Sequence, residues 1–491
     1  MLPRILEKRR SLFYLCVLST ILLLLSCFFL WRTSNDSLIP QSVLMLMFVN
    51  NTSSGLSTGN NTNSSQLTNH FRKIYPTVLD DRQTLATKNS PCSKDEMSAK
   101  SRRLCDPARA LLRVYMYDLP PMFHFGLLNW KGKAQQLWPD ISTMSQIPRY
   151  PGGLNLQHSV EYWLTLDLLA SNSGVVRPCT AIRVMNSSSA DVIFVPFFSS
   201  VSYNRHSKLH GKEKVSRNNF LQDELVNFLM SQEEWKRSGG KDHLIVAHHP
   251  NSMLNARRKL GSAMFVLADF GRYSANVANI KKDVIAPYRH VVSSIGCESP
   301  PFTGRPILMY FQGAIYRKDG GAIRQELYYL LKDEKDVHFA YGTVKSNGIS
   351  NAGRGMSSSK FCLNIAGDTP SSNRLFDAIA SHCVPVIISD GIELPFEDVL
   401  DYTEFCVFVR ASDAIKEGFL LELLRRIRQD EWTKMWERLK QISYHFEYQY
   451  PSQQGDAVQM IWGAVSRKLP SVHLALHREN RFRRSSQDHM S

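Results

Sequence analysis

Short apolar runs alternate with longer segments of helical periodicity over most of the chain. The runs 113–119, 190–198 and 242–249 are bounded by Asp, Pro or Gly, which is typical of buried strands. Apolar residues recur at helical spacing in 158–171 and 218–235 and predict helices there. Strands that alternate with helices predict βαβ units, and therefore a parallel sheet with helices on both faces.

A second series of the same kind begins near Pro287. It predicts strands and helices over these ranges: strands 305–313, 360–367, 384–389 and 406–409, helices over 322–332 and from Arg374, and a helical region from 420 to about 468. Two α/β series predict two Rossmann-like domains that face a cleft. Ligands bind to open sheets of this kind beyond the carboxyl ends of the strands, so the cleft is the expected site.

An uncharged run of 21 residues, 11–31, precedes this α/β body. A helix of that length spans the hydrocarbon layer of a membrane, which is about 30 Å thick. Four basic residues and one acidic residue come before the run, so the N-terminus should stay in the cytosol and the body should cross. A cleaved signal peptide is the alternative, but its apolar region usually covers about 7–15 residues and ends in small side chains. We expect an uncleaved signal anchor.

The segment after the anchor is polar and rich in glycosylation sequons. Residues 50–69 contain 17 Asn, Ser, Thr or Gly in 20 positions, too few apolar groups to offset the cost of ordering the chain. We expect a flexible stem with glycan sites. The sequons lie at Asn35, Asn50, Asn51, Asn60, Asn63 and Asn186.

Seven cysteines follow the anchor, so at least one stays free or pairs between chains. Cys92 and Cys105 flank a polar loop and are the first candidates for a bridge. Cys383 and Cys406 have apolar neighbours, which predicts inert core thiols.

Composition excludes a disordered or fibrous chain, since 43% of the residues are hydrophobic and 21% are charged. The net charge of +15 suits nucleic acid, membranes, acidic polysaccharides or phosphorylated small molecules as partners. The membrane topology argues against nucleic acid. The basic segment 471–491 should be a solvated, mobile end.

Two strand–loop–helix junctions in the second series carry the candidate binding chemistry. In the first, Ser371 and Ser372 precede Arg374, so hydroxyls, backbone N–H groups and a planar cation gather at a helix start. An ordinary N-cap with a surface ion pair is the alternative. In the second, Gly313 ends a strand and Arg317 and Arg324 follow. Neither junction is a dinucleotide fingerprint or a P-loop, but together they favour a diphosphate ligand.

Acidic residues and one histidine complete the candidate set. Glu393 and Glu397 follow a strand where a carboxylate could bind ribose hydroxyls, unless they are exposed loop acids. Candidates for a catalytic base in the first series are Asp118, His158 and Glu161. No D-x-D motif occurs in the sequence, so we expect no metal cofactor and predict that arginines neutralise the leaving group.

The run 357–405 resembles the signature of the exostosin-like glycosyltransferases, family GT47. The segments 113–123, 190–200, 235–250 and 316–321 match in order, and the resemblance covers about 110 to 470. Within the family, 267–272, 316–321 and 459–470 are most similar to a plant clade of pectic arabinan arabinosyltransferases.

The resemblance implies an inverting Golgi enzyme of GT-B architecture with a type II topology. A UDP-sugar would be the donor substrate, a pectin-like polysaccharide the acceptor, and related transferases possible oligomer partners. The donor site would use Gly313, Arg317, Arg324, Ser371, Ser372, Arg374, Glu393 and Glu397. Ile365, and Ala314 with Ile315, depart from the family pattern and bear on sugar specificity.

This interpretation divides the chain as follows: a cytosolic tail 1–10, a signal anchor 11–31, a luminal stem 32–110, an acceptor domain 111–286, a nucleotide-sugar domain 287–470 and a basic tail 471–491. Three alternatives stay open at this point: a non-catalytic partner subunit, a GT47 transferase that acts on xylan or xyloglucan, and a carbohydrate-binding module.

Overall fold

A computed structural model describes residues 107–488, apart from 134, 210, 212, 297, 318–320 and 344–346, and these residues belong to one compact unit. The expected anchor, the sequons of the stem and the Cys92–Cys105 pair lie outside the described residues. Among the described helices, none has an apolar stretch long enough to cross a membrane.

The first sheet has six strands in the order β2-β1-β3-β4-β5-β6, and every pair in it is parallel, as predicted. Its strands are β1 Leu112–Met116, β2 Ala181–Val184, β3 Val192–Val195, β4 His243–Val246, β5 Met264–Leu267 and β6 Val284–Ile285. The central strands β3, β4 and β5 are buried at every position, which explains their continuous apolar sequences.

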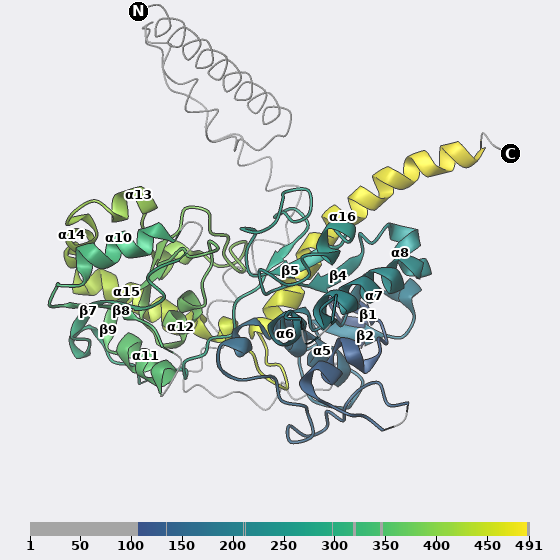
Figure 1. The fold of residues 1–491 in the computed structure, drawn as a ribbon, viewed down its shortest axis with the longest axis horizontal. Coiled ribbons are helices and arrows are strands. Elements are labelled where there is room, and N and C mark those ends of the chain that lie inside the picture. Colours follow the sequence, from purple (N-terminus) through teal and green to yellow (C-terminus); the bar gives the residue numbers. More distant parts are fainter. Residues whose placement is uncertain are drawn as a thin grey trace, which may run out of the picture. The chain divides into compact units, whose positions relative to one another are not determined.

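Helices cover this sheet and partly match the prediction (Figure 1). They are α5 Val160–Ala170, α6 Ser199–His206, α7 Arg217–Ser231, α8 Glu233–Ser238 and α9 Ala256–Lys259. The single helix predicted over 218–235 is two helices, because Gln232 adopts an extended backbone between α7 and α8.

The second sheet has five strands in the order β11-β10-β9-β7-β8, again all parallel. Its strands are β7 Ile307–Gly313, β8 Val337–Tyr341, β9 Ser359–Ile365, β10 Val384–Ile388 and β11 Val407–Phe408. The strands missed by the sequence patterns, β2, β5, β6 and β8, are short or are edge strands with few consecutive apolar residues.

Helices pack on both faces of the second sheet, since alternate strand residues point to opposite faces. Met309 and Phe311 join a core with α10, α14 and α15, whereas Tyr310 joins Met356 of α11 and Ala378 of α12. These helices are α10 Ala322–Leu331, α11 Gly348–Ser357, α12 Arg374–Ala380, α13 Ala411–Ala414, α14 Phe419–Arg426 and α15 Gln429–Ile442.

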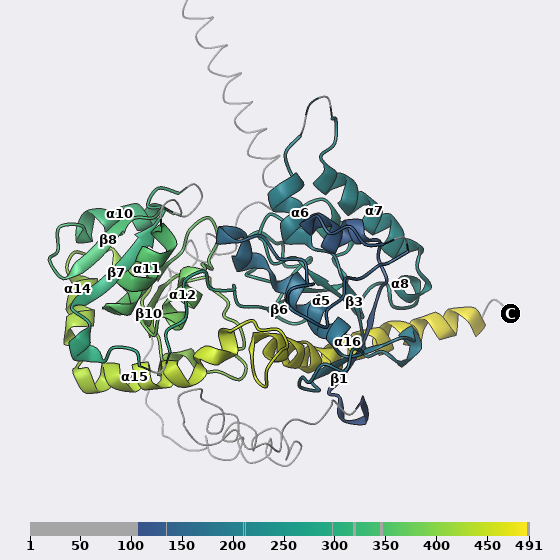
Figure 2. The same ribbon diagram turned by 90° about the horizontal axis from the view of Figure 1, so that it is seen from below.

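The last helix, α16 (Ala457–Asp488), leaves the second half and returns to the first (Figure 2). It contacts α5 and β6, and its Trp462 donates to the buried Asp167 of α5 at 3.0 Å. Arg177 pairs with the same carboxylate at 3.2 Å. The helical region expected from 420 to 468 is therefore three separate helices, and α16 continues as a helix beyond residue 470 where a mobile tail was expected. The domain boundary at 286 and 287 stays a prediction.

Short 3₁₀ helices fill several of the connections. They are η2 Pro107–Arg109, η3 Pro121–Phe123, η4 Phe125–Leu128, η5 Gly153–His158, η6 Ser187–Ser189, η7 Phe302–Gly304, η8 Tyr402–Glu404 and η9 Ser443–Phe446. Of these, η5 matters most for the site, because it ends at His158 immediately before α5.

The cysteines differ from the prediction in one respect. Cys383 is not an inert thiol, because it forms a disulfide with Cys362. Cys362 lies in β9 and Cys383 directly precedes the neighbouring β10, so their Cα atoms are only 5.7 Å apart. Cys406 is a free, buried thiol, as predicted.

The disulfide should contribute to stability because it closes a loop of 21 residues that contains α12. We expect the double substitution Cys362→Ala and Cys383→Ala to lower the free energy of unfolding by about 3 kcal/mol, measured by urea denaturation. Cys406→Ala is the control, since it removes a buried sulfur without opening a loop. An equal loss in both proteins would contradict the expectation.

Candidate active site

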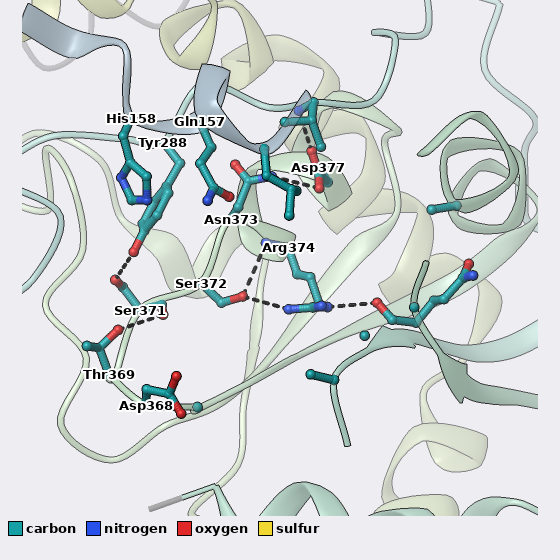
Figure 3. Close-up of a pocket in the computed structure, with 18 of the residues that line it drawn as sticks. Gln157, His158, Tyr288, Asp368, Thr369, Ser371, Ser372, Asn373, Arg374 and Asp377 are labelled. Atoms are coloured by element: carbon teal, nitrogen blue, oxygen red, sulfur yellow. Dashed lines mark hydrogen bonds between the residues drawn. The ribbon is translucent and has the colours of Figure 1, made fainter. Parts of the chain in front are cut away.

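A cavity of about 570 Å³ lies between the two halves, where strands of both sheets end. From the first half, its walls include Gln157 and His158 of η5 and His249 after β4. From the second half they include Gly313 at the end of β7 and the loop 367–373 after β9, called here the donor loop (Figure 3). This is the cleft position that the two parallel sheets predict.

Seven of the eleven candidate residues line this cavity. They are His158, Gly313, Arg317, Arg324, Ser371, Ser372 and Arg374. Asp118, Glu161, Glu393 and Glu397 do not line it.

Arg324, which is buried, and Arg374, which is partly buried, bring two cations to the carboxyl edge of the second sheet. Arg324 donates to the carbonyls of Ala366 at 2.9 Å, Ala314 at 3.1 Å and Ile365 at 2.7 Å. Arg374 donates to the carbonyl of Gln312 at 2.8 Å. Neither forms an ion pair with a carboxylate among the described residues. Asp368 and Asp377 lie in the same wall and attract these cations without forming ion pairs with them. With Arg317, the second half contributes three arginines and two carboxylates to the wall, so positive charge is in excess there.

Burial lowers the pKa of Arg324 to about 9 and that of Arg374 to about 10. Mutual repulsion between the two guanidinium groups adds to the lowering at Arg324. Both stay protonated at neutral pH, and an anion beside them would relieve the repulsion.

Gly313 is required by this packing. A Cβ atom there would lie 2.0 Å from the Nη2 atom of Arg374, which real structures do not tolerate. The glycine that was predicted to end a strand therefore leaves space for the guanidinium group of Arg374.

The start of α12 contributes less than the sequence suggested. The helix has only seven residues, and the N–H groups of Arg374 and Leu375 already bond to Ser372 Oγ at 3.4 Å and Ser372 O at 3.2 Å. Ser372 Oγ also accepts from Arg374 Nη1 at 3.2 Å, which leaves its own proton free to donate.

Ser371 has a different role from the one predicted. Its hydroxyl donates to Asp269 Oδ2 of the first half, a residue that follows β5. Because a hydroxyl has one proton, the Tyr288 hydroxyl must be the donor in its 2.8 Å contact with Ser371 Oγ. Ser371 therefore ties the donor loop to the first half and has no proton left for a phosphate.

Arg317 forms a half-exposed ion pair with Asp368 at 3.0 Å. Such pairs contribute little and break easily, so this cation can exchange partners when a ligand enters.

His158 lies on the opposite wall and is 4% exposed. Its Nδ1 atom is 2.9 Å from Nδ1 of His248, and its ring centroid lies 5.0 Å from that of Tyr288. Burial lowers the pKa of His158 well below its usual value, with further lowering by His248 and His249. The imidazole is therefore neutral and can accept a proton.

The other two base candidates have no access to the cavity. Asp118 pairs with Arg183 at 2.6 Å and accepts from Trp138 Nε1 at 2.8 Å. Glu161 is fully enclosed and accepts from the Tyr150 hydroxyl and from the Ser200 N–H, each at 3.1 Å.

Glu393 and Glu397 lie in the connection after β10, outside the cavity walls. Burial raises the pKa of Glu397, and repulsion from Glu393 adds to this. The ribose role predicted for the pair stays a prediction.

The sequence patterns missed Asp269, Arg272, His248, His249 and Tyr288. The two histidines were included in a strand predicted over 242–249, but β4 ends at Val246, which places them beyond its carboxyl end. Asp269, Arg272 and Tyr288 follow the short strands β5 and β6. Polar residues directly after a buried strand were the available signal.

Among the described residues, no group of three or more His, Cys, Asp or Glu side chains gathers as it would around a metal ion. The expected absence of a metal cofactor stays a prediction. The cationic side chains that line the cavity are arginines, which suit phosphate oxygens.

Comparison with known proteins decides the family. Residues 108–425 match the family model described as the Exostosin GT47 domain. The chain belongs to the GT47 exostosin family of glycosyltransferases. The protein named "Probable arabinosyltransferase ARAD1" from Arabidopsis thaliana is 39% identical over 77% of this chain and 83% of its own length. One named as a probable glucuronosyltransferase from Oryza sativa subsp. japonica is 27% identical over 76% of this chain and 83% of its own length.

The free energy of unfolding of this GT47 chain should depend on pH through Glu161, because burial raises the pKa of Glu161 from 4.5 to about 7. The folded state then binds a proton between these pH values that the unfolded state releases. Stability from this group is therefore lost as the pH rises through 7. The shift corresponds to about 3 kcal/mol.

We expect Glu161→Gln to remove that dependence. The free energy of unfolding of the variant, relative to wild type, should be about 2.5 kcal/mol larger at pH 8 than at pH 5 in urea titrations. Other titrating groups, such as the buried Asp456, are present in both proteins and cancel in the difference. A difference that does not change with pH would contradict the assignment.

Proposed function

We propose that this GT47 transferase moves a sugar, with arabinose favoured, from a UDP-sugar to a pectin-like cell-wall polysaccharide. One observation carries the proposal: Arg324 and Arg374, neither of which forms an ion pair with a described carboxylate, face a neutral histidine across one cavity. The first group suits a diphosphate and the second suits the removal of a hydroxyl proton.

The donor would bind on the second half with its diphosphate against Arg374 and Arg324. Arg374 lies in the cavity wall with Ser372, whose hydroxyl proton is free for a phosphate oxygen. Arg317 can leave Asp368 and add a third cation. Ser371 would hold the donor loop in place rather than contact the diphosphate.

The reaction would be a single displacement with inversion at the anomeric carbon. The acceptor hydroxyl loses its proton to His158 as its oxygen bonds to the anomeric carbon. The bond from that carbon to the phosphate oxygen breaks, and UDP leaves with the electron pair. Arg374 and Arg324 stabilise the charge that develops on UDP, in place of a metal ion.

Arabinose is favoured as the sugar because the relative named as an arabinosyltransferase is 39% identical, against 27% for the glucuronosyltransferase. A donor screen with UDP-arabinose, UDP-xylose, UDP-galactose and UDP-glucuronate, against pectic and hemicellulosic oligosaccharides, tests this choice. Incorporation from UDP-glucuronate alone would overturn it and would favour xylan or xyloglucan as acceptors.

We further propose a Golgi location with a single type II anchor over 11–31 and the α/β body in the lumen. The disulfide of Cys362 and Cys383 is compatible with that oxidising compartment. The sequon at Asn186 is exposed at the start of η6, where a glycan can be attached. Assembly with related transferases is part of the same proposal.

Arg374→Lys tests the donor site. Lysine keeps the charge but loses the planar guanidinium, so we expect UDP to bind about 10- to 100-fold more weakly by calorimetry. Arg305→Lys is a matched control, because Arg305 is also buried and donates to the carbonyls of Pro300 and Ser359. Arg305 does not line the cavity. Equal affinities of the two variants would reject the donor assignment.

His158→Gln tests the base. We expect kcat to fall by about 10²- to 10⁴-fold while the affinity for UDP stays the same, because the imidazole acts only on the acceptor proton. His445→Gln is the control, since His445 is equally buried and bonds to the carbonyl of Gly455 outside the cavity. An active His158→Gln enzyme would show that another group takes the proton.

A further inference from the structure

Two histidines and one backbone carbonyl form a hydrogen-bonded series next to the cavity. His248 Nε2 is 3.1 Å from the carbonyl oxygen of Ala286, and His248 Nδ1 is 2.9 Å from Nδ1 of His158. His248 is fully buried and does not line the cavity. His248 can therefore affect the reaction only through its hydrogen bond to His158.

The positions of the protons in this hydrogen-bonded series follow from the carbonyl of Ala286 at its end. A backbone carbonyl can only accept, so Nε2 of His248 must carry a proton. Burial, together with repulsion from His249, lowers the pKa of His248 to about 3, so the ring carries one proton only. Nδ1 of His248 is then an acceptor with a lone pair.

His158 must match that acceptor. Two lone pairs facing each other at 2.9 Å would repel, so Nδ1 of His158 carries the proton and donates it. Since His158 is also neutral, its Nε2 atom has the lone pair.

The Nε2 atom of His158 is not fully enclosed by the protein. It makes no hydrogen bond with any described residue, and it is not one of the enclosed side-chain atoms that lack a partner. The residue lines the cavity beside Tyr288, which connects to Ser371 of the donor loop (Figure 3).

We infer that His248 is a positioning residue that fixes His158 in the tautomer with its lone pair on Nε2, facing the acceptor hydroxyl. This inference rests on the proposed role of His158 as the base. In free histidine the proton resides mainly on Nε2, so without His248 the basic atom would mostly be turned away from the acceptor. Once Nε2 has taken the acceptor proton, the Nδ1–H bond to His248 becomes charge-assisted and stronger.

Two variants at position 248 and one control variant at position 445 test the inference in the full-length chain. His248→Leu removes the acceptor of the bond, whereas His248→Asn keeps an oxygen near the place of Nδ1. His445→Leu makes the same apolar change at a buried histidine outside the cavity.

We expect His248→Leu to lower kcat by about 10- to 100-fold, the range for loss of a group that orients a catalytic side chain. The affinity of His248→Leu for UDP should equal that of wild type, and the kcat of His445→Leu should not change. His248→Asn should recover most of the activity. Equal losses of kcat in the Leu and Asn variants would overturn the inference, because a packing role predicts that result.

A second readout does not depend on activity. Nitrogen NMR of the full-length chain labelled with ¹⁵N-histidine distinguishes protonated from unprotonated ring nitrogens, and His158→Gln assigns the signals. We expect an unprotonated Nε2 for His158 in wild type and a shift of the proton toward Nε2 in His248→Leu. A proton on Nε2 in wild type would overturn the inference, even if His158 proves to be the base. Should His158→Gln stay active, the proposed function would fail while the spectra still decide the tautomer.

Discussion

The hydrogen bonds of Ser371 join the two halves at the cavity. The donor loop belongs to the second sheet, yet Ser371 donates to Asp269 and accepts from Tyr288, both in segments that follow strands of the first sheet. The same contact brings the Tyr288 ring against His158. This small group of hydrogen bonds therefore links the proposed base to the proposed diphosphate site, and residues of both halves line the cavity.

Charge is distributed unequally across this contact. The second half contributes Arg324 and Arg374, which donate to carbonyl oxygens, and the first half contributes histidines that burial keeps neutral, together with Arg272. A cavity with two such arginines on one side and a neutral proton acceptor on the other separates the two tasks of a glycosyl transfer. Stabilising the leaving group needs a permanent cation, whereas removing a proton needs a group that starts uncharged.

Much of the fold could be predicted from the sequence because its main strands are continuous apolar runs, and parallel sheets buried on both faces require such runs. Arg374 and His158 could be predicted because each lies next to the start of a helix. The role of Ser371 could not, since its partner Asp269 is 102 positions away in the chain. The pattern also extended β4 to His249, because apolar character does not reveal where pairing with the neighbouring strand stops. The Cys362–Cys383 disulfide could not be predicted either, because it depends on β9 and β10 being neighbours in the sheet.

The return of α16 to the first half affects how the protein is made. Ala457, Val458, Ile461 and Trp462 belong to the same core as β3, β4 and β5, and Trp462 completes the hydrogen bonds of Asp167. During synthesis these residues leave the ribosome only after the whole second half. The N-terminal half therefore lacks part of its core until translation is nearly finished, so it cannot mature ahead of the rest as early domains of many multidomain proteins do.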